Sequence, residues 1–368
     1  MGSESSKVPS DEEIGVKSTF SEITIPYPEF TYDEKHDRRI NYICISPNRD
    51  FLVSGGEDGV VRIWEITTRK CVDVLKGHQG YITCILALEE YVVTGSGDKT
   101  IIKWNFNSGD HLLTFEGHSC MIKNLEVHEN MLFSSSFDKT AKIFNFSTGE
   151  CLYTLTGHTR LINSMFVIPE GEMVITGSGD GTVRAWNFAT GETKLEFTAN
   201  SSPILCVKID MEKRLLYTGG DDATIRQWEL DTGAHKARLF GHRSAVLCLC
   251  LHTNKNVIFS GSSDRMVRKW STQSKKGRMS SGDLEHGSIG ALVMHDLSKL
   301  GEYIFAGTTT GTIICIDASS MCPTRMYQPQ MKSVPRFLIV DDRIYIGTYE
   351  GEIQAWKADL ATISTMKN

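Results

Sequence analysis

The 368-residue sequence predicts an all-β chain that closes on itself as a single ring of four-stranded sheets. Three observations predict it: a motif that recurs along the chain, a nearly constant spacing between its copies, and turn residues between short apolar runs. The motif SGGEDGVVRIW at 54–64 is followed by seven further copies, the last two weaker. They begin at residues 94, 134, 176, 218, 260, 306 and 346. A period of about 40–45 residues is typical of a β-propeller with four strands per blade.

Each copy carries its own strand evidence. Residues 71–104 contain four short β-rich runs separated by turn signals, among them Gly77-His78 and Gly97-Asp98. Eight copies predict eight blades, and seven blades plus an irregular segment is the alternative, because the copy at 306–316 is weak. The predicted organisation is a disordered N-terminal tail at 1–21, the propeller at 22–357 and a C-terminal tail at 358–368.

The outer strand of each blade is expected between successive motifs. Five such strands are predicted at 71–76, 111–116, 151–156, 193–198 and 235–240. The sixth and seventh are expected within 271–285 and 320–330. The eighth must come from elsewhere, and residues 22–34 are the candidate, because pairing the two chain ends leaves no exposed sheet edge. The tail at 358–368 is the alternative.

Over about residues 36–356 the chain resembles the WD-repeat family, although no Trp of the motif is followed by Asp. The resemblance implies a buried hydrogen-bond chain in each blade, in which His bridges an Asp carboxylate and a Ser or Thr hydroxyl, and that hydroxyl meets the Trp indole. The positions that match are His36, Ser54, Asp58 and Trp64; His78, Thr94, Asp98 and Trp104; His118, Ser134 and Asp138; His158, Thr176, Asp180 and Trp186; Thr218, Asp222 and Trp228; and His242, Ser260, Asp264 and Trp270.

Three blades depart from this pattern more strongly than the rest. The fifth has Asn200 where His is expected, the seventh has Ala306 in place of Ser or Thr, and the eighth has Ile346 there but retains Trp356. The third has Phe144, which lacks the indole N–H, so its chain should end one bond short.

A Ser, His and Asp set also suggests a hydrolase triad. Here the set recurs at one period, and no GxSxG surrounds the hydroxyl. We therefore expect a structural role, with no catalytic residue, no cofactor and no metal.

Composition and charge limit the remaining classes. Lys and Arg number 39 against 45 Asp and Glu, a net charge of −6, which argues against a nucleic-acid binder. No apolar run is long enough to span a membrane, and no secretory signal is evident. Ten cysteines without a CxxC pair are typical of a reducing compartment. We expect a cytoplasmic monomer, with the nucleus as the alternative.

The first residues match the N-myristoylation pattern at Gly2, with Ser6 at the required place. One acyl chain gives only marginal membrane binding, so membrane association is expected only if Gly2 is acylated. A disordered polar start is the alternative. The longest insertion, 271–288, is expected to be a flexible connector.

The resemblance also implies that three positions per blade line the top face of the ring. Several of them are apolar here, and exposed apolar surface usually marks an interaction site. The predicted partner-binding residues are Arg39, Tyr81, Met121, Lys123, Phe137, Leu161, Pro203, Leu205, Leu247 and Tyr349. The alternative is that some of these side chains are shielded.

The functional hypothesis is a non-enzymatic scaffold or adaptor that binds other proteins or peptides through an apolar top-face patch on blades 2–6, with no small-molecule substrate. The alternatives are a substrate-recognition subunit of a ubiquitin ligase, a G-protein β-like subunit and a nucleic-acid-associated scaffold. The first two are weakened because no F-box-like segment and no heptads precede the repeats.

Overall fold

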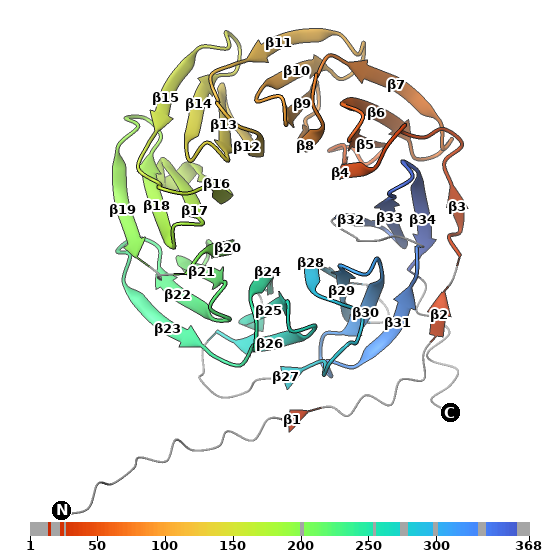
Figure 1. Cartoon of the computed structure of the whole chain (residues 1–368), viewed down its shortest axis with the longest axis vertical. Coiled ribbons are helices and arrows are strands. Elements are labelled where there is room, and N and C mark those ends of the chain that lie inside the picture. Colours follow the sequence, from red (N-terminus) through yellow and green to blue (C-terminus); the bar gives the residue numbers. More distant parts are fainter. Residues whose placement is uncertain are drawn as a thin grey trace, which may run out of the picture.

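A computed structural model of the chain describes residues 14–15, 23–25, 27–198, 202–252, 255–272, 279–296, 301–329 and 336–358. These residues form eight sheets arranged as blades around one axis (Figure 1). The prediction of an all-β propeller with eight blades is confirmed, and the count of seven is wrong. The described residues contain no α-helix, and thus no helix long enough to cross a membrane; a 3-10 turn lies at Pro169–Gly171.

The first four blades follow the chain in order, each from its inner strand outward. They are β4 (Ile40–Ile45), β5 (Phe51–Gly56), β6 (Val60–Glu65) and β7 (Cys71–Lys76); β8 (Ile82–Ala87), β9 (Tyr91–Ser96), β10 (Ile101–Asn105) and β11 (His111–Phe115); β12 (Ile122–His128), β13 (Met131–Ser136), β14 (Ala141–Asn145) and β15 (Cys151–Leu155); and β16 (Ile162–Ile168), β17 (Met173–Ser178), β18 (Thr182–Asn187) and β19 (Thr193–Thr198).

The last four blades draw on both ends of the chain. They are β20 (Ile204–Asp210), β21 (Leu215–Gly220), β22 (Ile225–Glu229) and β23 (His235–Leu239); β24 (Val246–His252), β25 (Val257–Ser262), β26 (Val267–Ser271) and β27 (Met279–Ser280); β28 (Ile289–Asp296), β29 (Glu302–Thr308), β30 (Ile313–Asp317) and β31 (Pro323–Tyr327); and β32 (Phe337–Val340), β33 (Arg343–Gly347), β34 (Ile353–Lys357) and β3 (Phe30–Thr31).

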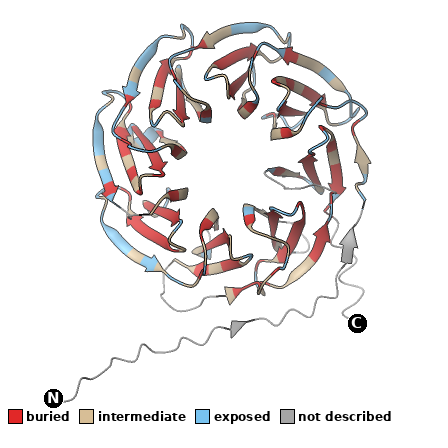
Figure 2. Ribbon diagram, viewed as in Figure 1, coloured by how far each residue is buried: buried red, intermediate tan, exposed pale blue. Residues whose placement is uncertain are grey.

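The second strand of each blade is covered on both faces by neighbouring sheets, so apolar residues are continuous along it. In β5, the adjacent residues Leu52 and Val53 both have no exposed surface. Outer strands β7, β11, β15, β19 and β23 carry most of the exposed residues that lie in strands, as Figure 2 shows. Burial is therefore greatest in the middle strands of each blade and falls toward the rim and toward the axis, which explains why the motif is apolar without strict alternation.

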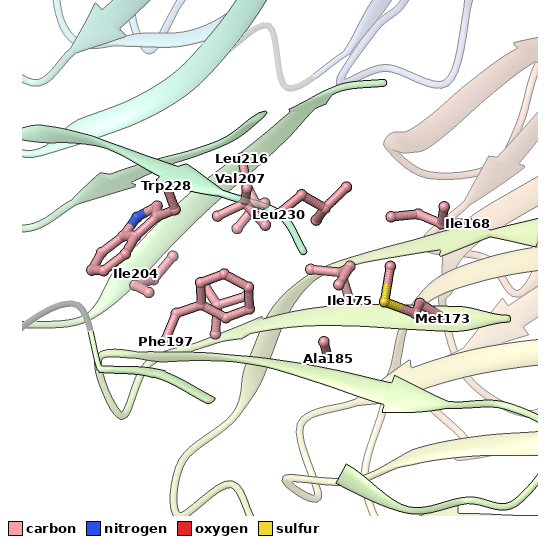
Figure 3. Close-up of a cluster of buried hydrophobic side chains, with 11 residues drawn as sticks. Ile168, Met173, Ile175, Ala185, Phe197, Ile204, Val207, Leu216, Trp228 and Leu230 are labelled. Carbon is pink, nitrogen blue, oxygen red and sulfur yellow. The ribbon is translucent and has the colours of Figure 1, made fainter. Parts of the chain in front are cut away.

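Apolar clusters fill the spaces between neighbouring blades. Figure 3 shows one of them, in which Phe197 of blade 4 meets Trp228 of blade 5 edge to face, with ring centroids 6.0 Å apart. Glycine in the motif permits this close stacking: a Cβ at Gly55 would lie 2.4 Å from Ile82 Cγ2 of the next blade. The SG or TG pair of the motif is thus an inter-blade contact as well as the end of a strand.

The ring closes through its N-terminal segment. Strand β3 pairs antiparallel with β34, with Phe30 opposite Ala355 and Thr31 opposite Gln354. The expectation that 22–34 supplies the last outer strand is confirmed, and β27 and β31 lie in the windows predicted for the sixth and seventh. The alternative strand donor, the tail after residue 358, lies outside the described residues.

Two short strands precede β3 on the outer side of the ring (Figure 1). Strand β2 (Ile23–Ile25) runs parallel to β31, and β1 (Ile14–Gly15) runs parallel to β27. The predicted N-terminal tail, 1–21, includes the two residues of β1. The remainder of that range lies outside the described residues.

Candidate protein-docking face

A four-residue hydrogen-bond chain ties together the strands and turns of blade 4. His158 Nδ1 lies 2.9 Å from Asp180 Oδ2, and His158 Nε2 lies 2.8 Å from Thr176 Oγ1. The indole N–H of Trp186 donates to the same hydroxyl oxygen at 2.8 Å. Because that oxygen accepts from the indole, its own proton points to Nε2, and the imidazole proton is on Nδ1, facing the carboxylate. One neutral tautomer thus satisfies every member of the chain.

The same arrangement recurs in blades 1, 2 and 6. The His–Asp distances are 3.0, 2.9 and 2.7 Å, and the His–hydroxyl distances are 2.7, 2.8 and 2.7 Å. The indole–hydroxyl distances are 2.7, 2.9 and 2.7 Å. The structure therefore brings together the residues His36, Ser54, Asp58 and Trp64; His78, Thr94, Asp98 and Trp104; and His242, Ser260, Asp264 and Trp270.

The carboxylates of these chains are held in the ionised form. Burial alone would raise the pKa of Asp180, but hydrogen bonds from Thr182, from two backbone N–H groups and from His158 outweigh it and lower the pKa to about 2. Burial, only partly opposed by Asp180, also lowers the pKa of His158. The pair is therefore carboxylate and neutral imidazole near neutral pH.

Blades 3 and 5 show what happens when a member is missing. In blade 3, His118 bonds Asp138 at 2.7 Å and Ser134 at 2.8 Å, and Phe144 ends the chain without an indole.

In blade 5, Trp228 donates to Thr218 at 3.2 Å. Asp222 accepts from Arg226 at 3.1 Å and from Arg238 at 3.0 Å. Asn200 lies outside the described residues. The arginine pair was missed from sequence, although an Arg two residues before Trp, combined with the absent His, was a usable signal.

Blades 7 and 8 lack the chain. In blade 7, Thr308 Oγ1 lies 2.7 Å from Thr312 Oγ1, a bond between two strand-end hydroxyls. In blade 8, the indole N–H of Trp356 is buried with no partner among the described residues, as expected with Ile346 in place of Ser or Thr.

The histidine sets offer no open catalytic site. Thr176 and Ser260 have no exposed surface, and their hydroxyls are shared between His and Trp. Within the described ranges, no group of three or more His, Cys, Asp or Glu side chains could hold a metal ion. The sets act as structural bonds within a blade.

The top face carries a pocket of about 350 Å³ over blades 1–3. Tyr81 forms one wall: its side chain is 42% exposed, and its hydroxyl donates to Met121 Sδ at 3.4 Å. The ring packs over the turn at Gly97, where a Cβ would lie 2.6 Å from Tyr81 Cε1. The full lining is Arg38, Asn41, Glu57, Tyr81, Ile82, Thr83, Met121 and Lys123.

Two cations stand close to this pocket. Burial first, and the charge of Arg336 second, lower the pKa of Lys123. Lys123 Nζ lies 6.0 Å from the Phe137 ring centre, and the Arg336 guanidinium lies 4.0 Å from the Tyr42 ring centre. Neither cation has a carboxylate partner within the described part of the chain. The mouth is therefore aromatic and locally positive.

The pocket brings together three of the ten predicted positions: Tyr81, Met121 and Lys123. Phe137 joins them through Lys123, and Arg38 rather than Arg39 lines the hollow. Among the others, Tyr349 is 46% exposed. The half-buried positions elsewhere around the ring are Arg39, Leu161, Pro203, Leu205 and Leu247. Gly2, and residues 273–278 of the long insertion, lie outside the described residues.

A belt of inter-blade bonds was also missed from the sequence. Asn41 donates to the Ile82 carbonyl at 3.1 Å and Asn163 to the Ile204 carbonyl at 2.7 Å. Cys206 and Cys248 make the equivalent contacts, to Val246 and Ile289. The recurring signal is an Asn or Cys at the second or third position of an inner strand, and the belt holds neighbouring blades at a fixed spacing.

Comparison with known proteins agrees with this geometry. The family described as "WD domain, G-beta repeat" matches residues 28–65, 69–105, 109–145, 149–187, 191–229 and 233–271, more than half of the chain. The chain belongs to this family, whose propellers are generally non-catalytic and typically bind other proteins.

Curated relatives match only short stretches. The general transcriptional corepressor TUP1 of Saccharomyces cerevisiae is 46% identical over 43 residues, 12% of this chain and 6% of the relative. WD repeat-containing protein 86 of Homo sapiens is 38% identical over 48 residues, 13% of each. A guanine nucleotide-binding protein subunit beta-like protein of Encephalitozoon cuniculi is 35% identical over 54 residues, 15% of this chain and 16% of the relative. The chain thus spans a sixth or less of the length of each.

Among solved structures, the computationally designed Ika8 protein superimposes with a TM-score of 0.77 at 26% identity. The match covers 88% of this chain and 98% of that one.

Proposed function

We propose that this chain is a non-enzymatic adaptor that docks a protein partner on its top face, with the pocket over blades 1–3 as the anchor point. The observation that carries the proposal is Tyr81, an exposed aromatic side chain on the wall of a concave pocket. A few residues dominate the binding energy of a protein interface, and Tyr is enriched among them. Lys123 and Arg336 add positive charge at the same mouth, which suits an acidic or phosphorylated partner segment.

The proposal includes a monomer in the cytoplasm, with membrane association only through an acylated Gly2. Three alternative functions remain: a substrate receptor of a ubiquitin ligase, a G-protein β-like subunit and a nucleic-acid-associated scaffold. The G-protein β-like relative favours the second and the transcriptional corepressor the third. All three also dock proteins, so the identity of the captured partners separates them.

The experiment is affinity purification with quantitative mass spectrometry. A Tyr81→Glu/Phe137→Glu double variant should lose the partners that the wild type captures. Leu112→Glu is the matched control, because Leu112 is 46% exposed on outer strand β11, away from the pocket. An unchanged partner set for the double variant, with folding intact by circular dichroism, would show that the pocket is not the docking site.

A further inference from the structure

A second hollow, of about 380 Å³, is formed by the other ends of the inner strands. Its walls come from the second halves of β16, β20 and β24, together with Leu292 of β28. These residues lie near the turns between first and second strands, opposite the face that carries the docking pocket. The hollow is therefore distinct from the docking pocket in both position and blades.

The lining of this hollow is apolar with a single charged exception. Phe166, Ile209, Leu251 and their neighbours supply aliphatic and aromatic surface, and the one ionisable cation is Lys208. If this hollow near the ring axis held only water, we would expect polar side chains to line it. A concave hollow with mostly apolar side chains and one convergent charged group has the usual composition of a small-molecule site.

Lys208 is available to a ligand. Its Nζ lies 5.7 Å from the centre of the Phe166 ring. Among the described residues, no carboxylate lies within 4 Å of it, and it makes no hydrogen bond. Burial raises the pKa of Cys250, and the charge of Lys208 is the main opposing influence, which is consistent with an ammonium directed into the hollow toward blade 6.

The Lys208 side chain is half-buried, so an anion in the hollow can pair with its ammonium while the apolar side chains cover the rest of the ligand. We propose that this hollow binds a linear apolar chain ending in a carboxylate, a ligand of the fatty-acid class. The carboxylate would pair with Lys208, and the alkyl chain would lie against Phe166, Ile209 and Leu251.

A peptide suits the hollow less well than an alkyl chain. Each peptide unit brings a donor and an acceptor that must be paired when they are buried. The lining side chains offer only Lys208 and the weak Cys250 thiol. One nearby backbone group is already used, because the Val167 N–H donates to Glu126 at 2.6 Å. An alkyl chain makes no such demand.

The test is isothermal titration calorimetry of the full chain with dodecanoate, below its critical micelle concentration. Saturable binding of one molecule per chain is expected. Lys208→Met keeps an unbranched apolar stem and should weaken binding tenfold to a hundredfold, since a charge-assisted bond contributes about 1.5–3 kcal/mol. Lys123→Met, in the other pocket, is the matched control and should bind as the wild type does.

Two further measurements separate charge from shape. The wild type should bind dodecan-1-ol more weakly than dodecanoate. Lys208→Met should bind dodecan-1-ol as tightly as the wild type does. Val167→Phe, which fills the hollow and keeps the charge, should block both ligands. Absence of saturable binding would overturn the proposal. So would equal binding of acid and alcohol, or tighter binding of a peptide ending in Leu-Leu-Glu. None of these outcomes depends on whether the top face docks a protein.

Discussion

Blades 4 and 8 hold the same kind of sheet together in different ways. Blade 4 has the complete chain of His158, Thr176, Asp180 and Trp186, with every polar group paired. Blade 8 has a Trp356 that is equally buried, but its indole N–H is unpaired. Blade 8 is instead held by β3, which arrives from the other end of the chain. Polar chains and ring closure are therefore two separate sources of stability, and a blade can lack one of them.

The largest effect is expected from breaking a complete chain. Asp180→Ala removes an ionised acceptor and leaves His158 and two backbone N–H groups without their partner, which should cost about 3 kcal/mol. Thr310→Ala, at the position that replaces Asp in blade 7, should cost less than about 1 kcal/mol because it removes only neutral hydroxyl bonds. Urea denaturation of both variants measures the difference, and equal losses would refute the distinction between blades.

A second experiment attempts to build the missing bond in blade 8. Ile346 occupies the Ser/Thr position, and Ile344, two residues earlier in β33, is equally buried in the same cluster. Both Thr variants lose apolar burial, but only Ile346→Thr offers the Trp356 indole an acceptor. Ile346→Thr should therefore cost about 1–2 kcal/mol less than Ile344→Thr. Equal midpoints of thermal unfolding for Ile346→Thr and Ile344→Thr would contradict this prediction.

Carboxylates whose pKa is lowered and a carboxylate whose pKa is raised should affect stability with opposite signs as the pH changes. The pKa values of Asp180 and Asp264 are lowered to about 2, so their contribution to stability is complete above about pH 4 and is lost as the pH falls toward 2. Burial instead raises the pKa of Glu126 from 4.5 to about 7, although the Val167 N–H opposes the shift. Ionising Glu126 therefore costs stability as the pH rises from about 4.5 to 7.

Glu126→Gln keeps an oxygen that can accept the Val167 N–H and removes the ionisation. We expect it to be more stable than the wild type at pH 8, by an amount on the order of 1 kcal/mol, with no difference at pH 4. Chemical denaturation at the two pH values decides this. If Glu126→Gln is no more stable than the wild type at pH 8, the pKa of Glu126 is not raised by burial.

The smallest effect concerns the arginines of blade 5. Arg238 is partly exposed, so its bond to Asp222 is screened by water and salt. Arg238→Gln should cost no more than about 0.5 kcal/mol at low salt and nothing measurable at 1 M NaCl. If Arg238→Gln still lowers stability at 1 M NaCl, the Arg238–Asp222 ion pair takes over the role of the missing His in blade 5 despite the exposure of Arg238.

The repeat made the ring, its blade count and most members of the polar chains predictable, because each chain lies within one copy of the motif. His36 illustrates this: its partners Ser54 and Asp58 follow at 18 and 22 residues, the same intervals as in blades 4 and 6. Contacts between blades were less predictable. The Asn163–Ile204 bond, the Arg336–Tyr42 contact and the hollow around Lys208 depend on which side chains converge from different blades, and the period carries no information about that.

The pairing of β3 with β34 also affects how the protein can be made. Residues 30 and 31 are synthesised before strands β4 to β33, and their partners Ala355 and Gln354 are added after those strands. Until then the early segment has no partner strand, and the inner strands of blade 8 lack their edge. Chain-growth arrest before residue 353 would leave an open arc with two unpaired sheet edges, a form prone to aggregate. Resistance to proteolysis should therefore rise abruptly, not gradually, over the last few residues of that pairing.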